Sequence, residues 1–263
     1  NVHDSAHVAC SHHGIVGDRY TSPRPLDVAI NRPVTAQDGF AFRVRQIGDT
    51  PLGASKAVHD FRPPNLMQIT SDYTKGAKLV LELHCVPTTP GRCRHIGRQV
   101  LVKGEDGTNP PGLGFFALPM PKWLLHISAS FFLHQDGAFL HHQEKILARR
   151  GYEARHRGAS APPSAEYPDL IYAPNSMDKG IITFRQWLRF RAQGGAPFEG
   201  SLALPPRDET GAVAYDVYHA HVKGCRYCLG ALRNFRRARV AACAAAALAV
   251  LCRPWLGLVG AAA

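Results

Sequence analysis

Residues 78–85, Lys78-Leu-Val-Leu-Glu-Leu-His-Cys85, form one of four segments that decide the fold class. Each segment carries β-branched or aromatic residues and is bounded by turn signals, which is the pattern of a β-strand. The other three segments are Ala41–Ile47, Leu66–Thr70 and Arg94–Val102. We expect these four strands to pair in an antiparallel sheet.

Helical patterns follow the strands along the chain. From Lys122 to about Arg150, apolar residues recur on one side of a helix. Gly151 is a natural stop for that helix. A second amphipathic helix is predicted over Ile182–Ala192. Strands followed by helices indicate an α+β fold.

The N-terminal run Asn1-Val-His-Asp-Ser-Ala-His-Val-Ala-Cys-Ser-His-His-Gly14 carries Asp4, His7 and His12. Two neutral imidazoles and one carboxylate are the ligands of mononuclear non-haem iron sites. Asp4 and His7 share one face of a helix, whereas His7 and His12 diverge by roughly 140° on a regular helix. Both histidines can therefore contact one ion only if the helix bends or breaks. A third ligand must come from elsewhere in the chain.

This run resembles the iron motif N-x-x-D-x-x-H-x-x-x-x-H of Rieske-type oxygenases, with Asn1, Asp4, His7 and His12 at its fixed positions. The resemblance implies that His7 and His12 bind iron and that a distant aspartate completes the ligand set. It also implies that Asp4 bridges a ligand histidine to the Rieske cluster of a neighbouring subunit, which predicts a homotrimer. His13 is the residue most easily mistaken for a ligand.

Asp136 fits the distant ligand. Its segment is similar to the one in which the family's ligand aspartate opens a helix and a glutamine follows, here Gln143. An alternative role for Asp136 is the N-cap of a helix that begins at Gly137, since aspartate is common there.

Within these oxygenases, the chain is similar to the plant and algal branch that contains pheophorbide a oxygenase and the chloroplast translocon-associated Rieske protein. A C-terminal C-x-x-C beside a hydrophobic tail is typical of this branch. The other similar segments are Phe61–Pro64, Cys85–Arg92, the Asp136 helix, Tyr172–Pro174, Asp178–Trp187 and Tyr218–Cys228. The resemblance implies a helix-grip fold, in which the antiparallel sheet curls around a long helix.

The resemblance also implies an oxidoreductase that uses Fe(II) and dioxygen on a chlorophyll-derived tetrapyrrole, either pheophorbide a or chlorophyllide a. Ferredoxin would supply electrons through a two-iron two-sulfur Rieske cluster, whose ligands are two cysteines and two histidines. The sequence has no complete set: Cys93-Arg-His95 imitates half of it, and the next cysteine is Cys225. We therefore expect a catalytic fragment of a longer protein, with the Rieske domain upstream of Asn1, in the chloroplast inner envelope or thylakoid membrane.

The C-x-x-C pair, Cys225 and Cys228, could serve in three ways. Such a pair lowers a thiol pKa and closes a disulfide easily, so we predict a redox switch open to thioredoxin. Zinc is an alternative, because His219 and His221 lie nearby in the sequence, and two inert thiols are a third. A redox switch also supports an alternative function, a redox-sensing chloroplast envelope protein associated with protein import.

The formal charge of +11 and the pI near 9.6 are compatible with nucleic-acid binding. However, five arginines gather beside the apolar tail, as expected at an anionic membrane surface: Arg226, Arg233, Arg236, Arg237 and Arg239. We therefore predict no nucleic-acid partner. The expected organisation is a catalytic domain over residues 1–200, a C-x-x-C segment over 201–239 and a membrane anchor over 240–263.

Overall fold

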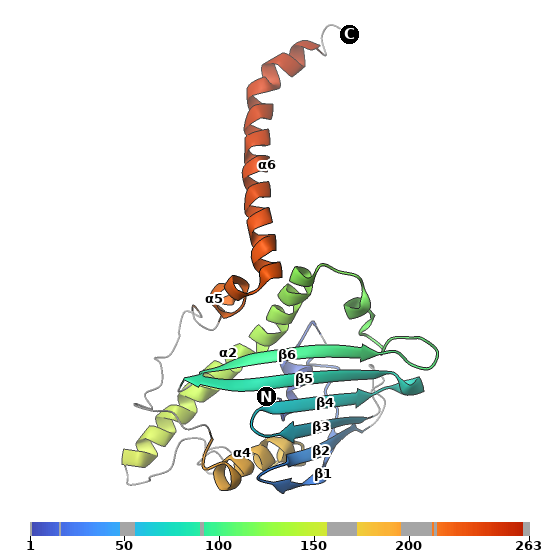
Figure 1. Cartoon of the computed structure of the whole chain (residues 1–263), viewed down its shortest axis with the longest axis vertical. Helices are drawn as coiled ribbons and strands as arrows, with labels where there is room; N and C mark the ends of the chain where they lie inside the picture. Colours follow the sequence, from blue (N-terminus) through green and yellow to red (C-terminus); the bar gives the residue numbers. More distant parts are fainter. Residues whose placement is uncertain are drawn as a thin grey trace. The chain divides into compact units, whose positions relative to one another are not determined.

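The structure is a computed structural model that describes residues 2–15, 17–47, 56–89, 92–156, 173–195, 212 and 215–259 (Figure 1). Asn1 and Tyr172 lie outside the described residues. The chain divides into two compact units. The first unit comprises Asn1–Pro119 and Phe132–Ala214, and the second comprises Met120–Phe131 and Tyr215–Ala263. The predicted boundaries at residues 200 and 239 stay predictions.

The first unit contains a six-stranded antiparallel sheet in which each strand pairs with the next along the chain (Figure 1). This arrangement confirms the α+β class and the predicted antiparallel pairing. The strands are β1 Leu26–Thr35, β2 Gly39–Gln46, β3 Lys56–Arg62, β4 Leu66–Asp72, β5 Lys78–Thr89 and β6 Arg92–Val102.

Two of these strands, β1 and β3, were not predicted from the sequence. Pro33 lies inside β1, and a proline argues against a strand in sequence terms. It is accommodated because β1 is an edge strand and its pairing with β2 shifts register after Arg32. Strand β3 is only seven residues long and contains three charged residues, so its sequence shows no clear alternation of apolar and polar residues.

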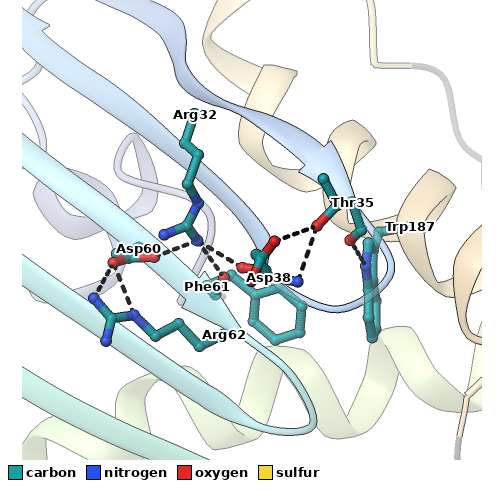
Figure 2. Close-up of polar contacts among 7 residues, drawn as sticks. All are labelled: Arg32, Thr35, Asp38, Asp60, Phe61, Arg62 and Trp187. Atoms are coloured by element: carbon teal, nitrogen blue, oxygen red, sulfur yellow. Dashed lines mark hydrogen bonds and ion pairs between the residues drawn. The ribbon is translucent and has the colours of Figure 1, made fainter.

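The core of the first unit lies between the sheet and helix α4, Lys179–Arg191. Phe40, Phe42 and Phe61 are almost completely buried there, and Trp187 packs edge-on against Phe61 with ring centroids 4.9 Å apart. Trp187 also donates its indole N–H to the backbone carbonyl of Thr35 at 2.8 Å (Figure 2). The predicted amphipathic helix over Ile182–Ala192 is thus present and covers the sheet.

A polar network joins β1, the β1–β2 turn and β3 (Figure 2). The Arg32 guanidinium donates to Asp60 Oδ1 and to the carbonyl of Asp38, both at 2.7 Å. Arg62 binds the other carboxylate oxygen of Asp60 at 2.9 Å. In the turn, the Asp38 backbone N–H donates to the Thr35 hydroxyl at 2.9 Å. These contacts hold β3 in place beside the N-terminal segment described below.

Apart from α4, the described residues form several short helices and two long ones. The short ones are α1 His7–Ser11, η1 Thr74–Gly76, η2 Gly114–Ala117, η4 Ser176–Asp178, α5 Val217–Ala220 and η5 Val222–Gly224. The long helices are α2 Lys122–His156 and α6 Arg226–Val259. The predicted stop at Gly151 is wrong, because one glycine costs a helix only about 1 kcal/mol.

Among the described residues, we find no helix with the length and apolar character needed to cross a membrane.

Candidate metal centre

The structure brings His7, His12 and Asp136 together, although Asp136 lies far from the histidines in sequence. One ligand atom from each lies within 4.8 Å of the others. Asp136 Oδ1 is 3.6 Å from His7 Nε2, and Asp136 Oδ2 is 3.3 Å from His12 Nε2. We call this group the His–His–Asp site. All three residues belong to the first unit.

Helix α1 ends between the two histidines of the site, His7 and His12. The helix stops at Ser11, and His12 leaves the helical conformation with φ −95° and ψ 37°. The two imidazole rings therefore approach each other, with centroids 5.4 Å apart and planes at 71°. A regular helix would hold residues with this spacing on different faces. The end of α1 is thus the break that the sequence spacing demands.

Asp136 lies inside α2, so its predicted position at a helix start and its alternative role as an N-cap are both wrong. The backbone N–H groups in a helix interior are already bonded to carbonyls four residues earlier. The Asp136 carboxylate is therefore not needed as a cap and remains available to other partners. Its side chain is nevertheless buried, with 6% exposure.

Two atoms of the site are buried without a hydrogen-bond partner among the described residues. They are Nε2 of His12, whose side chain is fully buried, and Oδ1 of Asp136. Buried polar atoms are nearly always hydrogen-bonded, because losing water without compensation costs free energy. A cation between the two histidines and the carboxylate would compensate both atoms. The donor set and these two atoms therefore fit a metal ion.

Both histidines present Nε2 to the site because their Nδ1 atoms are engaged elsewhere. The side-chain oxygen of Gln135 lies 3.1 Å from His12 Nδ1 and can only accept, so Nδ1 carries the proton. His7 Nδ1 likewise donates to the backbone carbonyl of Asp4. Burial lowers the pKa of His7, which outweighs the opposing effects of Asp136 and Asp4 and favours the neutral imidazole that binds metals.

Asp4 contacts His7 through its backbone carbonyl and through its carboxylate, whose Oδ2 lies 3.8 Å from His7 Nδ1. Its carboxylate oxygen Oδ1 accepts the backbone N–H groups of Ala6 at 2.9 Å and His7 at 3.3 Å. The carboxylate therefore supports the start of α1, and the Asp4 backbone carbonyl orients the His7 ring. The predicted bridge from Asp4 to a neighbouring subunit stays a prediction.

Two residues beside the site, Gln135 and His59, were missed from the sequence. Gln135 orients His12, and Phe132 stacks on the His12 ring with centroids 3.5 Å apart. His59 on β3 donates to the Val2 carbonyl at 3.3 Å and accepts the Ser5 hydroxyl at 3.1 Å. Burial lowers the pKa of His59 to about 4, so it stays neutral and holds the N-terminal segment against the sheet. His59 could not be found without β3.

Other candidate residues do not belong to the His–His–Asp site. His13 Nδ1 accepts the backbone N–H of Arg19 at 3.1 Å, and Gln143, the glutamine expected from the resemblance, is exposed. Cys225 and Cys228 belong to the second unit, where both are free thiols. Their predicted redox role stays a prediction.

Replacing Gln135 by Leu should weaken Fe(II) binding about 10- to 100-fold, the usual cost of removing a partner that orients a ligand histidine. The amide oxygen that fixes the His12 tautomer would be lost, while the ligands would remain. Gln143→Leu is the matched control, because Gln143 is exposed on the same helix. Anaerobic Fe(II) titration measures both variants. Equal affinities for the two would contradict the orienting role of Gln135.

Comparison with known proteins finds one family model and relatives that match parts of the chain. Residues 61–154, which include Asp136, match the family model described as pheophorbide a oxygenase. Protochlorophyllide-dependent translocon component 52, chloroplastic, of Arabidopsis thaliana is 26% identical over 158 residues, covering 57% of this chain and 24% of that protein. No solved structure matches the chain significantly.

Two chloroplastic pheophorbide a oxygenases match over most of the chain. The Arabidopsis thaliana protein is 23% identical over 245 residues, which cover 90% of this chain and 43% of that protein. The Oryza sativa subsp. japonica protein is 24% identical over 259 residues, which cover 94% of this chain and 47% of that protein. The chain thus spans less than half the length of each of these relatives. The chain is therefore distantly similar to these two pheophorbide a oxygenases over most of its length, and the family model matches residues 61–154.

Proposed function

We propose that this chain is the catalytic part of a Rieske-type oxygenase that acts on a chlorophyll-derived tetrapyrrole. The observation that carries the proposal is the His–His–Asp site, with buried, unpartnered atoms on His12 and Asp136. Two imidazoles and one carboxylate are typical ligands of non-haem Fe(II). The distant homology to pheophorbide a oxygenases supports the oxidoreductase class.

Fe(II) bound at this site would supply the activation of dioxygen. His7, His12 and Asp136 would hold the ion, and the chain's other residues would keep these ligands in position. Gln135 and the Asp4 carbonyl fix the two imidazole rings. Phe132 covers one face of the His12 ring and keeps water away from it.

The names of the relatives support the substrate class of this proposal, whereas its partners follow from the resemblance to Rieske-type oxygenases. Pheophorbide a is the first candidate substrate, and chlorophyllide a and protochlorophyllide are the alternatives. Electrons would come from ferredoxin through a Rieske cluster held by another domain. The relatives are chloroplastic, which supports the chloroplast part of our proposal that the protein works at a chloroplast membrane, either the inner envelope or the thylakoid.

A binding experiment tests this substrate class without requiring turnover. The Fe(II)-loaded chain is treated anaerobically with nitric oxide, a dioxygen analogue that gives the iron an electron paramagnetic resonance signal. Pheophorbide a should bind and change that signal, because substrate and gas would occupy neighbouring positions at one site. A chain that binds iron but leaves the signal unchanged with all three tetrapyrroles would contradict the substrate class.

Asp4→Asn should keep most of the iron, because the Asn side-chain oxygen can still accept the N–H groups of Ala6 and His7. In an assembly that includes the Rieske domain, however, turnover should fall at least tenfold, because the proposed bridge between subunits needs the carboxylate. Iron content and turnover are measured on the same preparation. Normal turnover in the variant would remove the bridge, and with it our reason to expect a homotrimer.

A second candidate function is a redox-sensing chloroplast envelope protein associated with protein import. The relative named as a translocon component favours it, as do the two adjacent thiols. The backbone N–H of Cys228 lowers the pKa of Cys225, whereas burial raises the pKa of Cys228 to about 11. This function requires Cys225 and Cys228 to exchange between dithiol and disulfide, for example with a thioredoxin.

A further inference from the structure

A second group of metal-ligating side chains lies in the second unit. His126 comes from α2, His221 directly follows α5, and Cys225 and Cys228 lie at the start of α6. One ligand atom from each residue lies within 4.8 Å of the other three. We propose that these residues, the Cys–His cluster, bind one zinc ion with tetrahedral geometry.

The distances between the ligand atoms match the edges of such a tetrahedron. Zinc–nitrogen bonds of about 2.05 Å and zinc–sulfur bonds of about 2.3 Å place two nitrogens about 3.3 Å apart and a nitrogen and a sulfur about 3.6 Å apart. In the structure, His126 Nδ1 is 3.1 Å from His221 Nε2 and 3.2 Å from Cys228 Sγ. Cys225 Sγ is 3.5 Å from His126 Nδ1, and Cys228 Sγ is 3.4 Å from His221 Nε2.

Hydrogen bonding alone does not explain these contacts. His126 Nδ1 has three close neighbours, namely His221 Nε2 and the sulfurs of Cys225 and Cys228. A ring nitrogen carries either one hydrogen or one lone pair, so it cannot make three good hydrogen bonds at once. A single ion between the four ligand atoms accounts for all the contacts.

The donor atoms select zinc among the common ions. Calcium and magnesium prefer oxygen ligands, whereas two thiolates and two imidazoles form one of the usual structural zinc sites. A Rieske cluster uses the same residue types, but it places the cysteines on one iron and the histidines on the other. The His126–Cys228 contact at 3.2 Å leaves no room for that separation. The cluster therefore fits one ion rather than two.

Local packing brings the four ligands together. The Cys225 carbonyl accepts the Leu229 N–H at 2.9 Å, which places Cys225 at the N-terminus of α6. The first turn of α2 meets α6 through a Lys122–Tyr227 contact of 3.2 Å and an edge-on Trp123–Phe235 pair with ring centroids 5.3 Å apart. These contacts place His126, which lies on α2, next to Cys225 and Cys228. A bound ion would cross-link the start of α2 to the start of α6.

His219, the other zinc ligand considered from the sequence, has a different partner. Its Nδ1 lies 2.6 Å from Asp216 Oδ2, and Asp216 Oδ1 accepts its backbone N–H at 3.0 Å. His126 takes its place in the cluster. The pattern C-x-x-C with a nearby H-x-H could not reveal this exchange, because His126 lies far upstream on another helix.

Metal analysis of the full chain, purified without chelators, tests the proposal. Wild type should contain about one zinc per chain, and His126→Ala and Cys228→Ser should each lose at least nine-tenths of it. His219→Ala is the matched control and should keep its zinc. His12→Ala should keep zinc while losing iron, which separates the two metal sites. Cobalt(II) exchanged into wild type should show the visible absorption bands of a tetrahedral ion with thiolate ligands.

Three results would overturn the zinc site. The first is a wild-type chain without zinc that fails to take up cobalt(II) in tetrahedral form. The second is His126→Ala with wild-type zinc content. The third is a Cys225–Cys228 disulfide that forms in mildly oxidising buffer despite equimolar zinc, since bound zinc should hold both thiolates and block oxidation. That last result would instead support the redox switch.

Discussion

Replacing His12 or Asp136 by Ala is expected to abolish Fe(II) binding, a loss of at least a hundredfold in affinity. Each substitution removes one of the three proposed ligands, His7, His12 and Asp136. His7→Ala should have the same effect, because its Nε2 lies 3.6 Å from the shared carboxylate. Anaerobic titration with Fe(II), followed by metal analysis after gel filtration, measures the loss. Circular dichroism of each variant checks that the fold survives.

His13→Ala is the control for these variants. His13 directly follows a ligand in sequence, yet its ring accepts the Arg19 N–H and lies at 5.9 Å from the Tyr20 ring. Iron affinity should therefore stay within about twofold of wild type. Loss of iron in His13→Ala, with iron retained in His12→Ala, would show that the motif register is wrong.

Gly39→Ala should destabilise the first unit by about 3 kcal/mol or more, through backbone strain and steric overlap together. Gly39 has φ +69°, and an added Cβ would lie 2.2 Å from the Phe61 carbonyl oxygen and 2.9 Å from the Phe61 ring. The turn between β1 and β2 must open to relieve this contact, which disturbs the Phe61 side of the core. Urea denaturation measures the change in unfolding free energy.

Gly107→Ala is the control that separates backbone strain from steric overlap. Gly107 has a similar φ of +76°, but an added Cβ would meet nothing within 4 Å. We expect this control to cost only about 1 kcal/mol, the penalty of the left-handed backbone conformation. If the two substitutions lowered the unfolding free energy equally, the turn between β1 and β2 would have relaxed without steric cost. Glycine would then be required at position 39 only because of its positive φ angle.

The two proposed sites would thus bind different metal ions, because their ligand atoms differ. Imidazole and carboxylate ligands suit Fe(II), whereas the two thiolates of the Cys–His cluster favour zinc. The two sets share no residue. A zinc ion at the start of α6 would also make Cys225 and Cys228 structural residues, in place of the redox pair that the sequence predicts.

The sequence by itself determined the features that depend on neighbouring residues. Local residue patterns predicted the strands β2, β4, β5 and β6 and their antiparallel pairing, and the composition and spacing of residues 4–12 predicted two ligand histidines. The resemblance added Asp136 as the third. It could not place Asp136 correctly within its helix, because the continuity of α2 depends on packing as well as on local propensity.

Only the tertiary structure decided which distant side chains meet. Gln135 at His12, His59 under the N-terminal segment and His126 beside the C-x-x-C pair each join parts of the chain far apart in sequence. Local pattern carries no information about such contacts, because they arise when strands and helices pack and bury their apolar faces. The same packing removed water from His12 Nε2 and Asp136 Oδ1. Burial without a partner is a property of the folded chain alone, and together with the three clustered donor groups it fits a metal ion at this position.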